Sequence, residues 1–167
     1  IKYYDNKTKR KDKSSKSMND FHSFIKKKII VDNLSGKRVL LDLGVGKAGD
    51  LNHWIDANCN TVIGLDVMKD NLDNINNGAC NRLLTKYVSK ENTELLDNTL
   101  MIWGDASKNL FSNEAGLDDL NKYYLDILYG NVDKNSINNN KLRNFYNIGT
   151  TIDLVVSNFA IHYFFEN

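Results

Sequence analysis

Three glycines follow an apolar segment that contains an acid, in the run Val39-Leu-Leu-Asp-Leu-Gly-Val-Gly-Lys-Ala-Gly-Asp-Leu. Gly44 and Gly46 let the backbone turn sharply out of a strand and pass close to a ligand, where a Cβ would obstruct it. A second acid, Asp66, ends the next apolar segment, and its carboxylate can accept hydrogen bonds from both hydroxyl groups of a ribose. This combination indicates a site for a nucleoside cofactor.

The charge beside the glycines separates two kinds of cofactor. The spacing from Gly44 to Gly49 also fits Gly-x-Gly-x-x-Gly, the dinucleotide fingerprint that places a pyrophosphate at a helix N-terminus. Asp42 lies two residues before the first glycine, where a carboxylate would repel a pyrophosphate but attract the sulfonium and ammonium groups of S-adenosylmethionine. We therefore expect S-adenosylmethionine, and the alternative enzyme is an NAD-dependent dehydrogenase.

The hydrophobic pattern that must position these residues predicts an α/β fold. Four apolar segments are typical of strands, the last of them with the Val and Leu content of a buried parallel strand: 38–43, 61–66, 99–105 and 152–157. Three segments have helical spacing: 18–31, about 49–57 and about 68–87. Ser17 or Asn19 is the expected cap of the first helix. A doubly wound parallel sheet follows from this alternation.

We expect one domain over 17–167, preceded by a basic, flexible segment over 1–16. Residues 107–150 are polar and rich in asparagine, and they predict an insertion with a helix around 117–128 and a mobile loop. The chain begins without methionine and ends after an aromatic cluster with four strands laid down. The sheet is therefore expected to be truncated on its C-terminal side.

Positive charge is concentrated at the N-terminal end of the sequence. Residues 1–28 contain ten Lys or Arg and three Asp, whereas the remainder contains twelve basic and eighteen acidic residues. A segment of charge +7 on a body of charge −6 favours contact with a polyanion such as RNA. For the Ser-rich part within 1–16, a solvated tail without a partner is the alternative.

Composition excludes several other classes. The longest apolar run is far shorter than the roughly 20 residues that cross a bilayer, so neither membrane insertion nor secretion is expected. Cys59 and Cys80 have neither metal-ligand nor disulfide spacing, which suits a reducing compartment.

Several segments, in order, resemble the messenger-RNA cap (guanine-N7) methyltransferases, and in particular those of large-DNA-virus capping enzymes. The segment Phe24-Ile-Lys-Lys-Lys-Ile-Ile is similar to the family's aromatic-x-Lys-x-x-Leu-Ile helix, and 41–51 is similar to its Leu-Asp-Leu-Gly-Cys-Gly-Lys-Gly-Gly-Asp-Leu loop. Three further landmarks follow: Gly104-Asp-Ala-Ser, Tyr146-Asn-Ile-Gly and Phe159-Ala-Ile-His-Tyr. The departures are Val45 for cysteine, Ala48 for glycine and Asn158 for the glutamine of many relatives.

The resemblance implies a Rossmann-like class I methyltransferase fold and a set of cofactor contacts. Lys26 would pair with the cofactor carboxylate, while Gly44 and Gly46 would line its methionine part. Asp66 would hold the ribose hydroxyls and Asp105 would receive the adenine amino group. Two further contacts complete the expected cofactor site: Asp42 and Asn158.

Aromatic residues near the end of the sequence resemble the family's pocket for the cap guanine: Phe159, His162 and Tyr163. A flat guanine ring needs a stacking face and polar groups at its edge, which these residue types supply. The implied reaction transfers a methyl group from S-adenosylmethionine to N7 of the cap guanosine and leaves S-adenosylhomocysteine. Since the N7 lone pair is free at neutral pH, proximity and electrostatics suffice, and we expect no catalytic base, nucleophile or metal.

The resemblance also implies partners and a location. The expected partners are capped RNA and the guanylyltransferase and triphosphatase domains of the same polypeptide, in a viral protein of the host cytoplasm or the virion. A non-enzymatic alternative is an inactive or accessory RNA-binding fragment of a capping enzyme.

Overall fold

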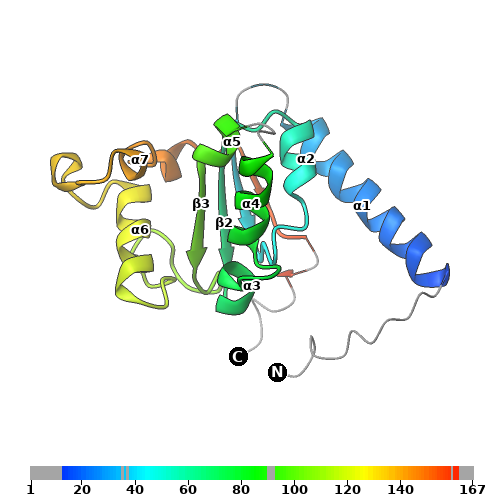
Figure 1. Ribbon diagram of the computed structural model, residues 1–167. Helices are drawn as coiled ribbons and strands as arrows, with labels where there is room; N and C mark the ends of the chain where they lie inside the picture. Colours follow the sequence, from blue (N-terminus) through cyan, green and yellow to red (C-terminus); the bar gives the residue numbers. More distant parts are fainter. Residues whose placement is uncertain (1–12, 35, 37, 90–92, 159, 162–167) are drawn as a thin grey trace.

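The computed structural model describes residues 13–34, 36, 38–89, 93–158 and 160–161, and its core is a sheet with helices on both faces (Figure 1). The sheet has four strands, all parallel, in the order β3-β2-β1-β4. Their bounds are β1 Val39–Leu43, β2 Thr61–Asp66, β3 Thr99–Trp103 and β4 Leu154–Val156. The predicted α/β class and parallel sheet are confirmed, and the sheet is compatible with a Rossmann-like fold.

The side chains of adjacent residues in each inner strand point to opposite faces of the sheet. Leu40 and Val62 pack with Trp54 in one apolar cluster, whereas Leu41 and Ile63 belong to a second cluster. Because both faces are buried, the inner strands read as continuous apolar runs instead of alternating with polar residues.

In the described ranges before β3 there are five helices: α1 Lys13–Asn33, α2 Leu51–Asp56, α3 Lys69–Asp73, α4 Ala79–Val88 and α5 Thr93–Asp97. The predicted cap of α1 at Ser17 or Asn19 is wrong, because the helix already includes Lys13. Residues 13–16 are therefore helical, and 1–12 lie outside the described residues. Among the described residues, no helix is long and apolar enough to cross a membrane.

A single helix over 68–87 is also wrong, because the chain turns between α3 and α4. Asn74 leaves the helical region with φ −56° and ψ 120°. A Cβ on Gly78 would lie 2.6 Å from the backbone nitrogen of Asn74, so the turn requires glycine at that position.

The Asn-rich segment forms the layer that covers the second face of the sheet. The helix expected around 117–128 is confirmed by a helix over Asp119–Tyr129, and the mobile loop expected in this segment stays a prediction. The segment contains two α-helices and two 3-10 helices: α6 Asp119–Tyr129, η1 Lys134–Ser136, α7 Asn140–Arg143 and η2 Ile148–Thr151. Leu125, Leu128 and Phe145 from this layer are buried against β2 and β3 in the second cluster. Figure 1 shows α6 and α7 on the opposite side of the sheet from α1 and α2.

Several asparagines in this layer have local structural roles. The Asn139 side chain accepts hydrogen bonds from the backbone of Lys141 and Leu142 at the start of α7. Asn113 and Asn147 adopt left-handed conformations, which asparagine tolerates better than most residues. Asparagine therefore marks caps and turns here.

The strand order creates a switch point between β1 and β4. The chain leaves β1 toward α2 on one face and reaches β4 from the α6–α7 layer on the other. In open parallel sheets, ligands bind beyond the carboxyl ends of strands at such a point.

Candidate cofactor site

The glycine loop after β1 turns tightly against the end of β2. The backbone nitrogens of Gly44 and Val45 both donate to the Leu65 carbonyl, at 2.8 and 3.0 Å. Gly44 has φ +79° and Gly46 has φ +57°, both in the left-handed region that favours glycine. The loop thus depends on glycine for its backbone shape, as the sequence predicts.

The two glycines differ in what surrounds them. A Cβ on Gly44 would lie 2.4 Å from the Cβ of Ala160, so the chain after β4 packs directly on the loop. A Cβ on Gly46 would meet no atom within 4 Å. Gly44 therefore permits close packing within the protein, whereas Gly46 faces open space of the kind a ligand can use.

Three distant segments meet at Asp50, which follows the loop and precedes α2. The Nζ of Lys26 lies 3.2 Å from Oδ1 and 3.1 Å from Oδ2 of Asp50. The amide nitrogen of Asn158 donates to Oδ2 at 3.1 Å. Helix α1, the glycine loop and the end of β4 are thereby joined through one nearly buried carboxylate.

Asp50 is absent from the predicted site residues. The available sequence feature was an acid directly after the third glycine, and it is the packing of α1 and β4 around the loop that gives this acid its partners.

Asp42, in β1, is almost completely buried. The pKa of its carboxyl group is raised to about 7, chiefly by burial and also by the nearby Asp50 and Asp66, while Lys26 lowers it. The cause is mainly loss of water around the charged form. A cation brought into the site would favour the ionised form of Asp42.

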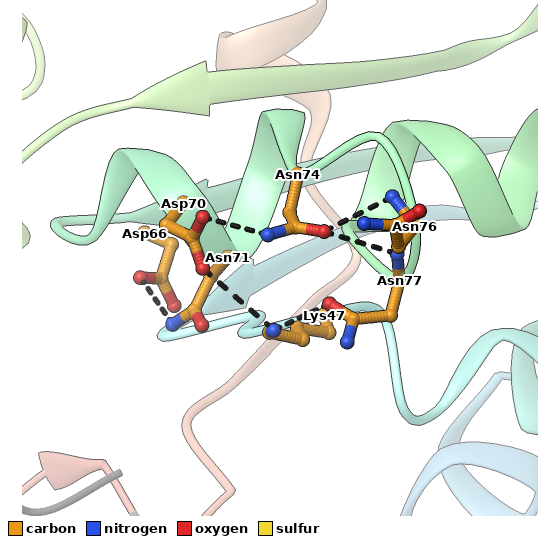
Figure 2. Close-up of polar contacts among 7 residues, drawn as sticks. All are labelled: Lys47, Asp66, Asp70, Asn71, Asn74, Asn76 and Asn77. Atoms are coloured by element: carbon orange, nitrogen blue, oxygen red, sulfur yellow. Dashed lines mark hydrogen bonds and ion pairs between the residues drawn. The ribbon is translucent and has the colours of Figure 1, made fainter. Parts of the chain in front are cut away.

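Asp66 ends β2 and ties the glycine loop to the chain that follows. Its Oδ2 accepts from the backbone nitrogen of Gly46 at 2.7 Å, and its Oδ1 accepts from the Met68 nitrogen at 2.8 Å. Asn71 adds a side-chain hydrogen bond at 3.1 Å (Figure 2). Because a carboxylate offers about four acceptor positions, Asp66 can still accept from a ligand hydroxyl.

A polar network holds the outer side of the loop (Figure 2). Lys47 donates to the Asn77 side chain at 2.5 Å and lies 3.8 Å from Asp70. Asn74 donates to Asp70 at 2.8 Å, and its Oδ1 accepts from the backbone of Asn76 and Asn77. The turn between α3 and α4 is thus organised around contacts to the glycine loop.

Asp105 lies two residues beyond β3, at the same edge of the sheet. Its Oδ1 accepts from the backbone nitrogen and hydroxyl of Ser107, at 2.9 and 2.7 Å. Trp103 connects this region to the end of β2, because its indole nitrogen donates to the Val67 carbonyl at 2.9 Å.

The structure brings most of the predicted cofactor residues to one edge of the sheet. Six of them surround the glycine loop: Lys26, Asp42, Gly44, Gly46, Asp66 and Asn158. Asp105 lies at the end of β3, with β2 between it and β1. The predicted cap-pocket residues Phe159, His162 and Tyr163 lie outside the described residues. Within the described ranges, no group of three or more His, Cys, Asp or Glu is arranged to hold a metal.

Comparison with known proteins relates the chain to a viral protein. No protein-family model matches the sequence. Over its whole length the chain is 27% identical, across 173 aligned residues, to a probable mRNA-capping enzyme of Acanthamoeba polyphaga mimivirus. The chain spans 13% of the length of that protein. The similarity supports a relationship to viral capping enzymes.

Proposed function

We propose that this chain transfers a methyl group from S-adenosylmethionine to N7 of the guanosine cap of messenger RNA. Two findings support the proposal. The chain is similar over its whole length to a viral protein named as a probable mRNA-capping enzyme. The switch point of its parallel sheet carries a glycine loop beside several carboxylates.

The charge around the loop is the observation that carries the choice of cofactor. Asp42, Asp50 and Asp66 are all buried beside the loop, and Lys26 is the cation paired with them in the described part of the chain. An excess of buried negative charge attracts a sulfonium and an ammonium group but repels a pyrophosphate. The site therefore favours a methyl donor over a nicotinamide dinucleotide.

The Lys26–Asp50 pair suits the amino-acid end of this cofactor. Its ammonium group would bind Asp50 and its carboxylate would bind Lys26, so each charge of the internal pair gains a partner of opposite sign. Such an exchange leaves no buried charge unpaired, which is the main penalty in burying ions. Asn158 would keep its hydrogen bond to Asp50 and hold the carboxylate in place.

The nucleoside end of the cofactor would lie along the ends of β2 and β3. Asp66, which already accepts three hydrogen bonds, would accept a further one from a ribose hydroxyl, and Asp105 would accept one from the adenine amino group. Val67 and Met68 are exposed directly after Asp66, which offers an apolar surface to the flat adenine ring.

The chain's own residues would act by position and charge. The cofactor would supply an electrophilic methyl group for in-line transfer to the N7 lone pair of guanine, with its sulfur as the leaving group. Asp42 and Asp50 would orient the donor by its positive groups, and Phe159, His162 and Tyr163 would hold the guanine plane against it. No side chain needs to remove a proton, because N7 carries none at neutral pH.

Calorimetry with S-adenosylmethionine, S-adenosylhomocysteine and NAD tests the proposal. We expect the first two to bind and NAD not to bind, and we expect Asp50→Asn and Asp66→Ala to weaken binding at least tenfold. Asp56→Asn is the matched control, because Asp56 also pairs with a lysine of α1 but is exposed.

Methyl transfer to N7 of capped RNA is then measured with the same variants. Tight binding of NAD would contradict the proposal. Binding of RNA without binding of either methyl-cycle nucleoside would instead favour an accessory RNA-binding role.

A further inference from the structure

The N-terminal half of α1 extends away from the rest of the fold (Figure 1). Every side chain from Lys16 to Phe21 is exposed. The C-terminal half is held on the protein by contacts that include the Lys26–Asp50 pair at 3.1 Å, the hydrogen bond between Ser23 and His53 at 3.2 Å and the buried side chain of Ile30. One end of the helix is thus anchored and the other is presented to solvent.

The solvent side of α1 carries large apolar side chains at three-residue spacing. Met18, Phe21 and Phe24 are 58%, 60% and 61% exposed. Phe21 and Ile30 are about two and a half turns apart, so they point to opposite sides of the helix. Contiguous exposed apolar residues of this kind mark an interaction surface more often than isolated ones do.

The charge around this surface indicates the kind of partner. Helix α1 contains five lysines and two aspartates, and residues 1–28 contain ten basic and three acidic residues. The rest of the chain is net negative, with twelve basic and eighteen acidic residues. A partner that contacts this helix and not the body is therefore expected to be a polyanion, and exposed aromatic rings among lysines are the combination that binds single-stranded nucleic acid.

The position of the surface relates it to the candidate cofactor site. Phe24 lies two residues before Lys26, whose Nζ is 3.1 Å from Asp50. At about 1.5 Å per residue, Phe21 lies about 7.5 Å further along the helix axis from the Lys26 position. Because residues two apart on a helix point about 200° away from each other, Phe24 faces away from the Lys26 side chain. A strand that leaves the cofactor site would therefore pass around the helix to reach Phe24 and then Phe21.

We infer that the outer face of α1 is a track for single-stranded RNA, with bases stacked on Phe21 and Phe24 and phosphates on the surrounding lysines. Lys27 and Lys28 can join because their ion pairs with Asp56 and Asp32 are exposed and contribute little stability. The inference rests on the proposed function in one respect only, which is that the bound RNA is the messenger RNA that carries the cap. Binding itself requires neither the cap nor methyl transfer.

Fluorescence anisotropy with a short, labelled, uncapped oligoadenylate tests this inference on the full chain. Phe21→Ala/Phe24→Ala is expected to weaken RNA binding about tenfold or more, as loss of stacking on aromatic residues does. Leu84→Ala/Val88→Ala is the matched control: those side chains are exposed apolar residues of α4, and we expect wild-type affinity. Because all four side chains are exposed, we expect helical circular dichroism to be unchanged.

Two further ligands separate stacking from charge. An abasic oligonucleotide of the same length is expected to bind wild type and the phenylalanine variant equally, because it has no bases to stack. S-adenosylhomocysteine is expected to bind the phenylalanine variant as it binds wild type. If neither the wild type nor the phenylalanine variant binds S-adenosylhomocysteine, while the wild type still binds the oligoadenylate more tightly than the variant does, the proposed methyl transfer is overturned but the track is not.

Three results would overturn the track: wild type that does not bind the oligoadenylate, a phenylalanine variant that binds it as tightly as wild type, or equal weakening by the α1 and α4 variants. Unchanged RNA affinity combined with loss of self-association, seen by sedimentation, would assign the face to a second copy of the chain instead.

Discussion

Asp42 is the residue whose burial is hardest to reconcile with stability alone. Its pKa is raised from 3.8 to about 7 in the folded protein, mainly because its carboxyl group has lost contact with water. An acid with a raised pKa destabilises the fold progressively as pH rises from the unfolded pKa to the folded one, because the unfolded state gives up its proton first. Retaining such a group is understandable if its charge serves a cationic ligand.

Replacing Asp42 by asparagine should therefore stabilise the protein in a pH-dependent way. We expect little difference from wild type at pH values below about 4, where the aspartate is protonated in both states, and a gain of a few kcal/mol above about pH 7. Urea denaturation across this range measures the difference. A gain that does not depend on pH would contradict the assignment of a raised pKa.

Substitution by alanine should lower the stability of the protein more at Gly44 than at Gly46. Ala48 already occupies a left-handed conformation in this loop, with φ +52°, so such a backbone can be tolerated at a cost of about 1 to 2 kcal/mol. Gly46→Ala should lose about that much stability, together with ligand affinity. Gly44→Ala adds a clash with Ala160 and should cost about 2 to 4 kcal/mol in total, measured by chemical denaturation. Equal losses of stability in the two variants would contradict the close contact between Gly44 and Ala160.

The contact between α1 and the glycine loop can be examined with a double-mutant cycle. Lys26→Met leaves the nearly buried Asp50 carboxylate without its cation and should lower the free energy of unfolding by about 1 to 3 kcal/mol. Lys26→Met combined with Asp50→Asn should restore much of that loss, because neither charge remains, but should not restore cofactor binding.

Lys27→Met is the control for this cycle. Lys27 pairs with an exposed Asp56, so its loss should cost less than about 1 kcal/mol. A larger effect at Lys27 than at Lys26 would show that the Lys26–Asp50 pair does not hold the helix.

At the scale of secondary-structure elements, the sequence predicts which helices and strands exist better than it predicts the residues at which they begin and end. Strand β2 is predicted to the residue, because an apolar run ends abruptly at Asp66. The turn between α3 and α4 is missed because helical spacing continues across it, whereas the break is held by bonds from Asn74 and Asn77 to Asp70 and Lys47. Lys47 belongs to the glycine loop, 30 residues before Asn77, so this contact leaves no trace in local periodicity.

The Asn-rich layer shows a second limit of local reasoning, and Asn121 offers a test of it. This asparagine is buried in α6, accepts from the Trp103 nitrogen at 2.8 Å and donates to the helix cap Asp118. Asn121→Ala should therefore cost about 1 to 3 kcal/mol, because buried polar groups lose their partners. The exposed Asn138→Ala should change stability by less than about 0.5 kcal/mol in the same thermal or urea measurement. Similarly small losses of stability for both variants would show that the Asn-rich segment is loosely held.

At the scale of the whole molecule, strand order decides what the sequence can and cannot reveal. The alternation of strands and helices predicts that acids at strand ends share one edge of the sheet, and Asp66 and Asp105 do so. The meeting of Lys26, Asp50 and Asn158 includes a hydrogen bond between positions 108 residues apart, Asp50 and Asn158, and depends on β4 lying beside β1. Asp50 could be recognised only once that arrangement was known.

The uneven charge of the molecule should appear as a salt effect. RNA affinity is expected to fall steeply with ionic strength, and removing residues 1–12, which contain five Lys or Arg, should flatten the dependence. The slope of log affinity against log salt for the full and shortened chains measures this. An unchanged slope would show that those residues do not meet the phosphates.

Strand β4 has only three residues and hydrogen-bonds to β1 alone among the described strands. Short edge strands detach at a lower free energy than central ones do. Since Asn158 follows β4 within two residues and Ala160 rests on Gly44, each detachment would pull the amide from Asp50 and uncover the loop. A nucleoside bound to the loop would therefore hold β4 in the sheet, so that ligand occupancy and the rigidity of this strand rise together.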